Sequence, residues 1–73
     1  MNGRYLVVGS VTYAMKGKET LLQNGIRAEA EKLRRVKVLG GCGYALLVDG
    51  RQISDAMRIL ALRGIRVYDV VDR

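Results

Sequence analysis

Three largely apolar segments predict β-strands, and the first of them contains β-branched residues between two glycines. They span residues 5–8, 43–48 and 65–71. The first run is short and lies between Gly3 and Gly9. The second is apolar at every position, as in a strand whose two faces are both covered, so we expect it in the middle of a sheet.

Two segments carry apolar residues at helical spacing. The first follows Ser10, which can cap a helix N-terminus, and ends before Gly25, which suits the position after a helix. The second follows Asp49, with Gln52 three residues later as a variant of the capping box, and ends at Gly64. We expect these helices to bury an apolar stripe each: Val11, Ala14, Met15, Leu21 and Leu22 in the first, and Ile53, Ala56, Met57, Leu60 and Ala61 in the second.

The segment between the first helix and the basic stretch has two competing interpretations. Ile26, Ala28 and Ala30 alternate with charged residues, which favours a half-buried strand. Alanine, glutamate, lysine and leucine up to Leu33 are good helix formers, so propensity alone favours a helix. The organisation of the whole chain decides for the strand.

The two halves of the chain resemble each other. Leu-Val-Val at 6–8, a helix with an Ala-Met pair and Gly-Ile-Arg at 25–27 are matched by Leu-Leu-Val at 46–48, a second Ala-Met pair and Gly-Ile-Arg at 64–66. Two strand–helix–strand units in 73 residues predict one α+β domain spanning 1–73. We expect a ferredoxin-like βαββαβ split sandwich, with a four-stranded antiparallel sheet, both helices on one face and the third strand between the first two.

Composition narrows the possible functions. Lysine and arginine number 13 against 7 acidic residues, a net charge of +6 that attracts anions. Histidine is absent and there is one cysteine, so we expect no disulfide within the chain, no metal site, no cofactor and no stand-alone enzyme. The chain shows neither a signal-peptide pattern nor the ~20 apolar residues of a membrane span, which predicts a cytoplasmic protein with a reduced thiol.

The cysteine stands in a segment of unusual composition. Gly40, Gly41, Cys42 and Gly43 form a predicted turn that enters the central strand. Glycines let backbone approach a partner closely and leave a cysteine between them reachable. The alternative is that Cys42 packs as a small hydrophobic residue, which is common for free cysteines.

Basic residues gather next to this turn. Arg34, Arg35 and Lys37 lie in the connection predicted for residues 34–41. In a ferredoxin-like fold this connection, Cys42 and Ser10 at the start of the first helix fall at one end of the sheet. A guanidinium within ~4 Å stabilises a thiolate by about 1 kcal/mol in water-like surroundings and about 4 kcal/mol at a half-buried site. Cys42 is therefore the candidate reactive residue, supported by the neighbouring arginines.

The chain resembles a family of small selenium/sulfur carrier-like proteins over nearly its whole length. The resemblance rests on Tyr5-Leu-Val-Val, Ala14-Met-Lys-Gly-Lys-Glu-Thr-Leu-Leu, Asn24-Gly-Ile, Cys42-Gly-Tyr-Ala-Leu and Gly64-Ile. It implies that Cys42 carries the chalcogen as a persulfide or selenenylsulfide, received from a donor such as a cysteine desulfurase-like enzyme and passed to an acceptor enzyme. The family often has serines where this chain has Gly40-Gly41, and a proline-containing loop at 34–37.

The sequence also allows two other functions, anion binding and RNA binding. A regulatory or anion-binding module would use backbone N–H groups of the glycines and the two arginines, with Cys42 incidental. RNA binding would stack bases on Tyr5 and Tyr44, but the usual basic-aromatic signatures are absent, so nucleic acid is not the expected partner. We also expect a homodimer through the open sheet face or an edge strand, because several apolar strand residues have no partner in a monomer.

Overall fold

The computed structural model describes residues 2–36 and 41–73, together with their side chains except those of residues 35, 36, 41 and 42. The elements in chain order are β1 (Gly3–Gly9), α1 (Val11–Gln23), β2 (Ala28–Val36), β3 (Gly41–Asp49), a 3₁₀ turn (Gly50–Gln52), α2 (Ile53–Leu62) and β4 (Asp69–Asp72). Both predicted helices and all four predicted strands are present.

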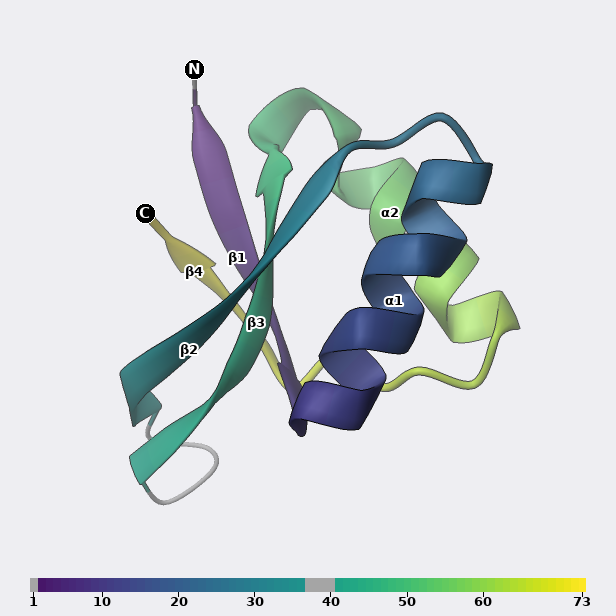
Figure 1. Ribbon diagram of the computed structural model, residues 1–73. Coiled ribbons are helices and arrows are strands. Elements are labelled where there is room, and N and C mark those ends of the chain that lie inside the picture. Colours follow the sequence, from purple (N-terminus) through teal and green to yellow (C-terminus); the bar gives the residue numbers. More distant parts are fainter. Residues whose placement is uncertain (1, 37–40) are drawn as a thin grey trace.

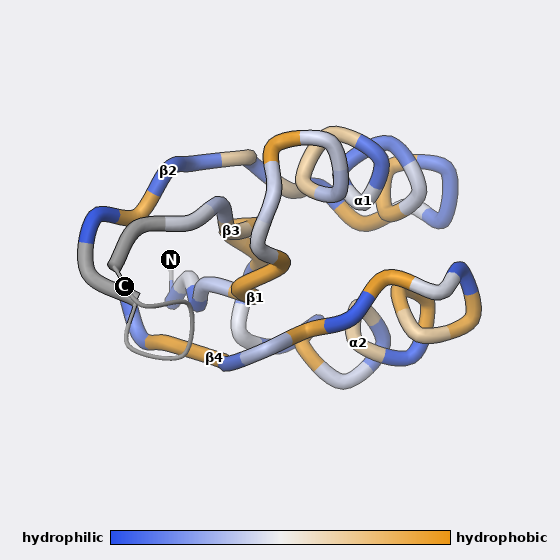
Figure 2. Tube along the Cα trace, turned by 90° about the horizontal axis from the view of Figure 1, so that it is seen from below, coloured by the Kyte–Doolittle hydropathy of each residue, from blue (hydrophilic) through white to orange (hydrophobic). Residues whose placement is uncertain are grey.

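The strands form one sheet in the order β2-β3-β1-β4, in which every neighbouring pair is antiparallel. The two helices lie side by side on one face of this sheet (Figures 1 and 2). The structure therefore confirms the ferredoxin-like split sandwich, with β3 between β1 and β2 as the crossover rule requires.

The main core lies between the helices and the sheet. Leu6 of β1, Leu46 of β3, Leu21 of α1 and Leu60 of α2 are each fully buried there. Gly17 lets the layers come this close, since a Cβ at this position would lie 2.8 Å from Leu46 Cδ1 and 3.2 Å from Leu60 Cδ2. The glycine that weakens α1 as an isolated helix thus serves its packing.

The helix ends only partly follow the prediction. Ser10 caps α1, because its Oγ accepts a hydrogen bond from the Tyr13 backbone N–H at 3.2 Å. Gly25 follows α1 with φ of +77°, a backbone conformation that favours glycine. Asp49, however, caps the 3₁₀ turn through the Arg51 backbone N–H at 2.9 Å, and Gln52 precedes α2 without a side-chain cap. The predicted capping box at the second helix is wrong, because the extra turn separates Asp49 from α2.

The predicted buried stripes are also partly wrong. Val11, Met15 and Leu22 of α1 are 48%, 55% and 63% exposed, and Met57 of α2 is 38% exposed. Ala61 is exposed as well. The buried residues are Ala14, Gly17, Thr20 and Leu21 in α1 and Ile53, Ala56 and Leu60 in α2. The small residues in each buried stripe allow close approach of helix to sheet, and Met15, Leu22 and Met57 lie at the exposed flank.

The bounds of all four strands differ from the prediction, β1 because it extends from Gly3 to Gly9. β2 is a strand as the chain organisation predicted, but it continues to Val36, so Arg34 and Arg35 belong to a strand instead of a loop. β3 begins at Gly41, which places Cys42 within a strand instead of a turn. β4 begins at Asp69 instead of residue 65, and the Ile65 N–H still bonds to the Leu60 carbonyl at the end of α2, 2.9 Å away.

Candidate functional site on the β2–β3 hairpin

The hairpin formed by β2 and β3 projects beyond the rest of the sheet. Gly9, the last residue of β1, pairs with Tyr44, whereas β2 stays paired with β3 as far as Val36 and Gly41. Cys42 lies two positions before Tyr44, about 7 Å further along β3 at the usual rise of a strand. In Figures 1 and 2 this end of the hairpin lies on the side of the molecule away from both helices.

An irregularity in the strand pairing lies directly at the cysteine. Leu33 pairs with Gly43 and Val36 pairs with Gly41, and the register shifts between these two pairs. Two residues of β2, Arg34 and Arg35, therefore stand opposite the single Cys42 of β3. This is a β-bulge, which bends its strand and leaves one residue outside the regular ladder. The chain thus brings two arginine positions opposite its one cysteine position.

A second bulge lies on the other side of β3. Val7 pairs with Ala45 and Gly9 with Tyr44, so β1 also gains a residue against β3. Gly9 has φ of +94°, which glycine adopts without strain. The first residues of β3 thus have a bulge on each neighbouring strand. Bulges are over-represented at sheet edges and beside functional sites, where they redirect side chains.

The predicted supporting residues are distributed as follows. Gly41 and Gly43 flank Cys42 within β3 and pair with Val36 and Leu33 of β2. Ser10 follows β1, and its hydroxyl already accepts a hydrogen bond as the cap of α1. The Arg34 side chain is exposed. Lys37 and Gly40 lie outside the described residues, as does the side chain of Cys42, so the reactivity of this thiol stays a prediction.

The one carboxyl whose pKa clearly departs from its ordinary value, within the part of the chain that the structure describes, lies at the opposite end of β3. The Arg51 side chain donates two hydrogen bonds to Asp49, to Oδ1 at 3.2 Å and to Oδ2 at 2.9 Å. With the bond from the Arg51 backbone N–H, they lower the pKa of Asp49 to about 2. Asp49 is therefore a charged cap of a turn, and nothing in its surroundings marks it as an acid or base.

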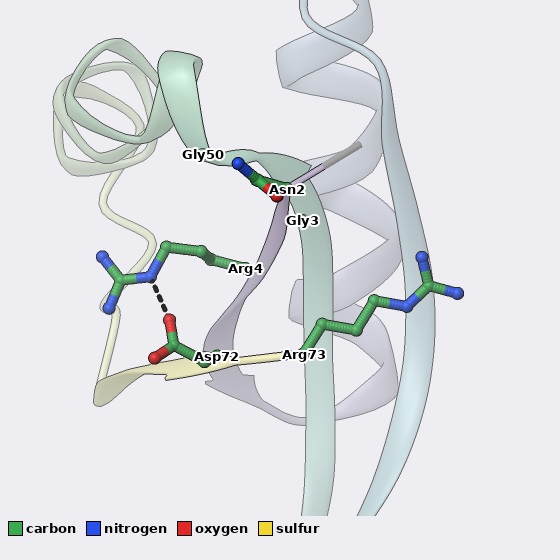
Figure 3. Close-up of a pocket in the computed structure, with 6 residues that line it drawn as sticks. All are labelled: Asn2, Gly3, Arg4, Gly50, Asp72 and Arg73. Atoms are coloured by element: carbon green, nitrogen blue, oxygen red, sulfur yellow. Dashed lines mark hydrogen bonds and ion pairs between the residues drawn. The ribbon is translucent and has the colours of Figure 1, made fainter.

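A shallow hollow between the two chain ends is a site that sequence reasoning missed. It is lined by Asn2, Gly3, Arg4, Gly50, Asp72 and Arg73 (Figure 3). Arg4 Nε lies 2.8 Å from Asp72 Oδ1. The Arg73 side chain points away from that of Arg4 (Figure 3). One arginine is neutralised and the other diverges from it, so the hollow does not form an anion clamp.

Metal clusters and membrane-spanning helices are both absent from the part of the chain that the structure describes. Residues 2–36 and 41–73 contain no group of three or more His, Cys, Asp or Glu residues that could hold a metal ion. Over the same ranges no helix is both long and apolar enough to cross a membrane. The candidate functional site is the bulged hairpin, where two arginine positions lie opposite Cys42.

Comparisons with known proteins found no relative of this chain. No protein-family model, no curated protein and no solved structure matches the chain.

Proposed function

We propose that this chain is a small carrier protein that holds sulfur or selenium on Cys42. The observation that carries the proposal is the β-bulge that sets Arg34 and Arg35 opposite Cys42. Opposite residues of an antiparallel pair have Cα atoms about 4.5–5.5 Å apart, within reach of an arginine side chain. The glycines on both sides of Cys42 have no side chains to shield the sulfur from a large donor.

Activation of the thiol depends on these arginines. A free cysteine has a pKa near ~8.5, so only a few per cent is thiolate at neutral pH. A guanidinium at ~4 Å favours the thiolate by about 1 kcal/mol in water-like surroundings and about 4 kcal/mol at a half-buried site. Since a pKa change of one unit equals about 1.4 kcal/mol, either value increases the reactive fraction at neutral pH.

Loading of the carrier requires no redox partner beyond the donor. The Cys42 thiolate attacks the terminal sulfur of a persulfide on a donor of the cysteine desulfurase class. The S–S bond of the donor breaks, its cysteine leaves as a thiolate, and Cys42 becomes the new persulfide. An acceptor enzyme takes the terminal sulfur by the same exchange, and selenium follows the same scheme as a selenenylsulfide. The cytoplasm, where thiols stay reduced, is the compartment in which this exchange would operate.

Alkylation kinetics test the role of the arginines. Iodoacetamide should modify Cys42 clearly faster at neutral pH than it modifies free cysteine. Arg34→Ala with Arg35→Ala should slow this reaction toward the rate of the free amino acid. Arg27→Ala with Arg58→Ala is the matched control, because it removes the same charge from exposed positions away from the bulge. Equal rates in both double variants would contradict a local effect of the bulge.

Mass spectrometry tests the cargo itself. Protein purified without reductant should carry one additional sulfur or selenium atom on Cys42, and reductant should remove it. Absence of any adduct after incubation with a desulfurase and cysteine would contradict the carrier function.

The anion-binding alternative uses the same two arginines but not the thiol. Cys42→Ser distinguishes the two functions, because it abolishes a carrier and leaves anion binding intact. Titration with phosphate, followed by NMR shifts of the Gly41 and Gly43 amides, gives the readout. Unchanged phosphate binding in Cys42→Ser, together with slow alkylation of the native thiol, would favour the anion-binding module.

A further inference from the structure

β2 is an open edge of the sheet. It is the outer strand in the order β2-β3-β1-β4 and extends over nine residues, Ala28–Val36. An edge strand leaves alternate backbone N–H and C=O groups without a strand partner and is a template for another strand. The other edge, β4, has only four residues. The longer edge is therefore the one with room for a regular fifth strand.

Exposed apolar side chains of α1 flank this edge. Met15, Lys18 and Leu22 lie at positions i, i+3 and i+7 and share one side of the helix. Lys18 Nζ lies 3.8 Å from Glu29 Oε2 of β2, whereas Gly17 packs toward Leu60 of α2. The side that carries Met15 and Leu22 therefore faces β2 and lies away from α2. These two side chains are 55% and 63% exposed and line a shallow hollow together with Lys18.

Between β2 and α1 there is room for the side chains of an added strand. Ala28 and Ala30 occupy the positions of β2 that face the helix layer, and both pack on the main core. Because these two side chains are small, they leave space beside them on the helix-covered face of the sheet. An apolar side chain on an added strand would fill this space and contact Leu22 and Met15 of α1. The β2 edge thus combines unpaired backbone groups with an adjacent exposed apolar surface on α1.

The charges along β2 oppose pairing with a second copy. Glu29 and Glu31 come first, and Lys32 and Arg34 follow. Two copies related by a two-fold axis pair antiparallel about one central residue. If a charged residue lies at the centre, it pairs with its own copy. If Ala30 lies at the centre, Glu29 pairs with Glu31. If Leu33 lies at the centre, Lys32 pairs with Arg34. Like charges directly opposite each other are destabilising, so self-pairing is disfavoured in each of these registers.

We propose that the β2 edge and the exposed side of α1 form a docking site for an extended segment of another protein, which adds as an antiparallel fifth strand. The complementary segment has acidic residues in its first half, opposite Lys32 and Arg34, and basic residues in its second half, opposite Glu29 and Glu31. Its apolar residues lie opposite Ala28 and against α1. Backbone hydrogen bonds supply affinity in this mode, and alternate side chains supply specificity.

The docking site shares Arg34 with the bulge at Cys42 but does not use the thiol. Strand addition uses the backbone of β2 and the surface of α1, neither of which involves the thiol. Cys42→Ser protein should therefore bind the segment as the native protein does. Failure of the docking site would leave the carrier function untouched, and the reverse also holds.

Two synthetic peptides test the charge order. Glu-Thr-Glu-Lys-Ile-Lys-Ile places each charge opposite its complement in an antiparallel register, and Lys-Thr-Lys-Glu-Ile-Glu-Ile reverses every charge. Both peptides have capped ends and no net charge, so the +6 of the protein attracts them equally. In fluorescence anisotropy titrations we expect the first to bind at least about tenfold more tightly, since four cross-strand pairs change sign. Lys32→Glu with Arg34→Glu should reduce this preference. Equal binding of the two peptides would overturn the proposal.

Backbone methylation tests the strand geometry. An added strand bonds to β2 through alternate amides and exposes the others. N-methylation of one alternate set of the first peptide should abolish binding, and methylation of the other set should leave binding intact. Equal affinity of the two methylated isomers would mean that the peptide does not bind as a strand.

Surface variants test the part played by α1. Met15→Ser with Leu22→Ser should weaken binding at least about tenfold without unfolding the protein, because both side chains are more than half exposed. Leu62→Ser on α2 is the control, since this leucine is 77% exposed. Sedimentation gives the remaining outcome: a dimer that the Met15 and Leu22 substitutions dissociate would identify a second copy as the occupant and overturn the proposal.

Discussion

The part of the sheet beneath the helices and the projecting hairpin are held together in different ways. Beneath the helices, fully buried leucines such as Leu46 interlock across layers that Gly17 allows to approach closely. In the hairpin, strand pairing is interrupted by a bulge, and Leu33 of β2 packs against a small second cluster formed by Val7 of β1 and Ala45 of β3. The core between the helices and the sheet therefore stabilises the fold, and the hairpin can tolerate irregular strand pairing at Cys42.

The same substitution made in each region gives the largest contrast. Leu46→Ala removes a fully buried side chain and should lower the free energy of unfolding by about 2–5 kcal/mol. Leu33→Ala removes a partly buried side chain in the hairpin and should lower it by about 1 kcal/mol. A domain of this size has roughly 4–11 kcal/mol in total, so the first change threatens folding and the second does not. Urea unfolding followed by circular dichroism measures both. Equal losses would show that the hairpin contributes to the core as much as the helix layer does.

The close approach at Gly17 gives the next effect. Gly17→Val should destabilise the protein by about 1–3 kcal/mol, because its side chain has no room between Leu46 and Leu60. Gly17→Ala should be closer to neutral, since alanine gains about 1 kcal/mol of helix propensity against a smaller overlap. Leu46→Ala removes the atom that lies nearest, so the loss caused by Gly17→Val should shrink in that background. A double-mutant cycle measures this coupling, and strict additivity would contradict the contact.

The architecture was accessible from the sequence because several local signals agree. The two strand–helix–strand halves set the topology, Ser10 and Gly25 mark the ends of α1, and the alternation around Ala28 identifies β2 against its helix propensity. Right-handed crossovers then leave one strand order. Where pattern, caps and topology point the same way, the sequence specifies the structure.

The details that failed depend on contacts between elements. Met15 and Met57 have the spacing of buried residues, but each helix buries other residues of its stripe and leaves its methionine at the surface. Asp49 has the sequence of a helix cap, but a 3₁₀ turn intervenes. The bulge opposite Cys42 depends on the register of two strands, which residue spacing in one strand cannot give. The sequence therefore names Cys42, Arg34 and Arg35 as candidates but does not give the register that sets them opposite one another.

The second cluster contains a hydrogen bond that tests how firmly the hairpin is joined to the sheet. Tyr5 Oη donates to Glu31 Oε1 at 3.2 Å, across β3, in a partly buried setting. Tyr5→Phe should lower the free energy of unfolding by about 0.5–1.5 kcal/mol. Tyr13→Phe is the control, because this ring is half exposed on α1. If the two variants lose equal stability, the bond from Tyr5 does not help to hold β2.

The smallest effect concerns the other end of β3, where Asp49 caps the 3₁₀ turn. The hydrogen bonds from the Arg51 side chain, and then that from its backbone N–H, lower the pKa of Asp49 from 3.8 to about 2. A carboxyl whose pKa is lower in the folded state stabilises the fold above its unfolded pKa, and this contribution is lost as pH falls. The melting temperature should therefore decline between about pH 4 and pH 2 partly through Asp49, and Asp49→Asn should flatten that portion of the profile. Glu19→Gln, at an exposed position of α1, should leave the profile as it is. An unchanged profile in Asp49→Asn would mean that the turn does not depend on the charge of its cap, and that this end of the sheet is secured by the core alone.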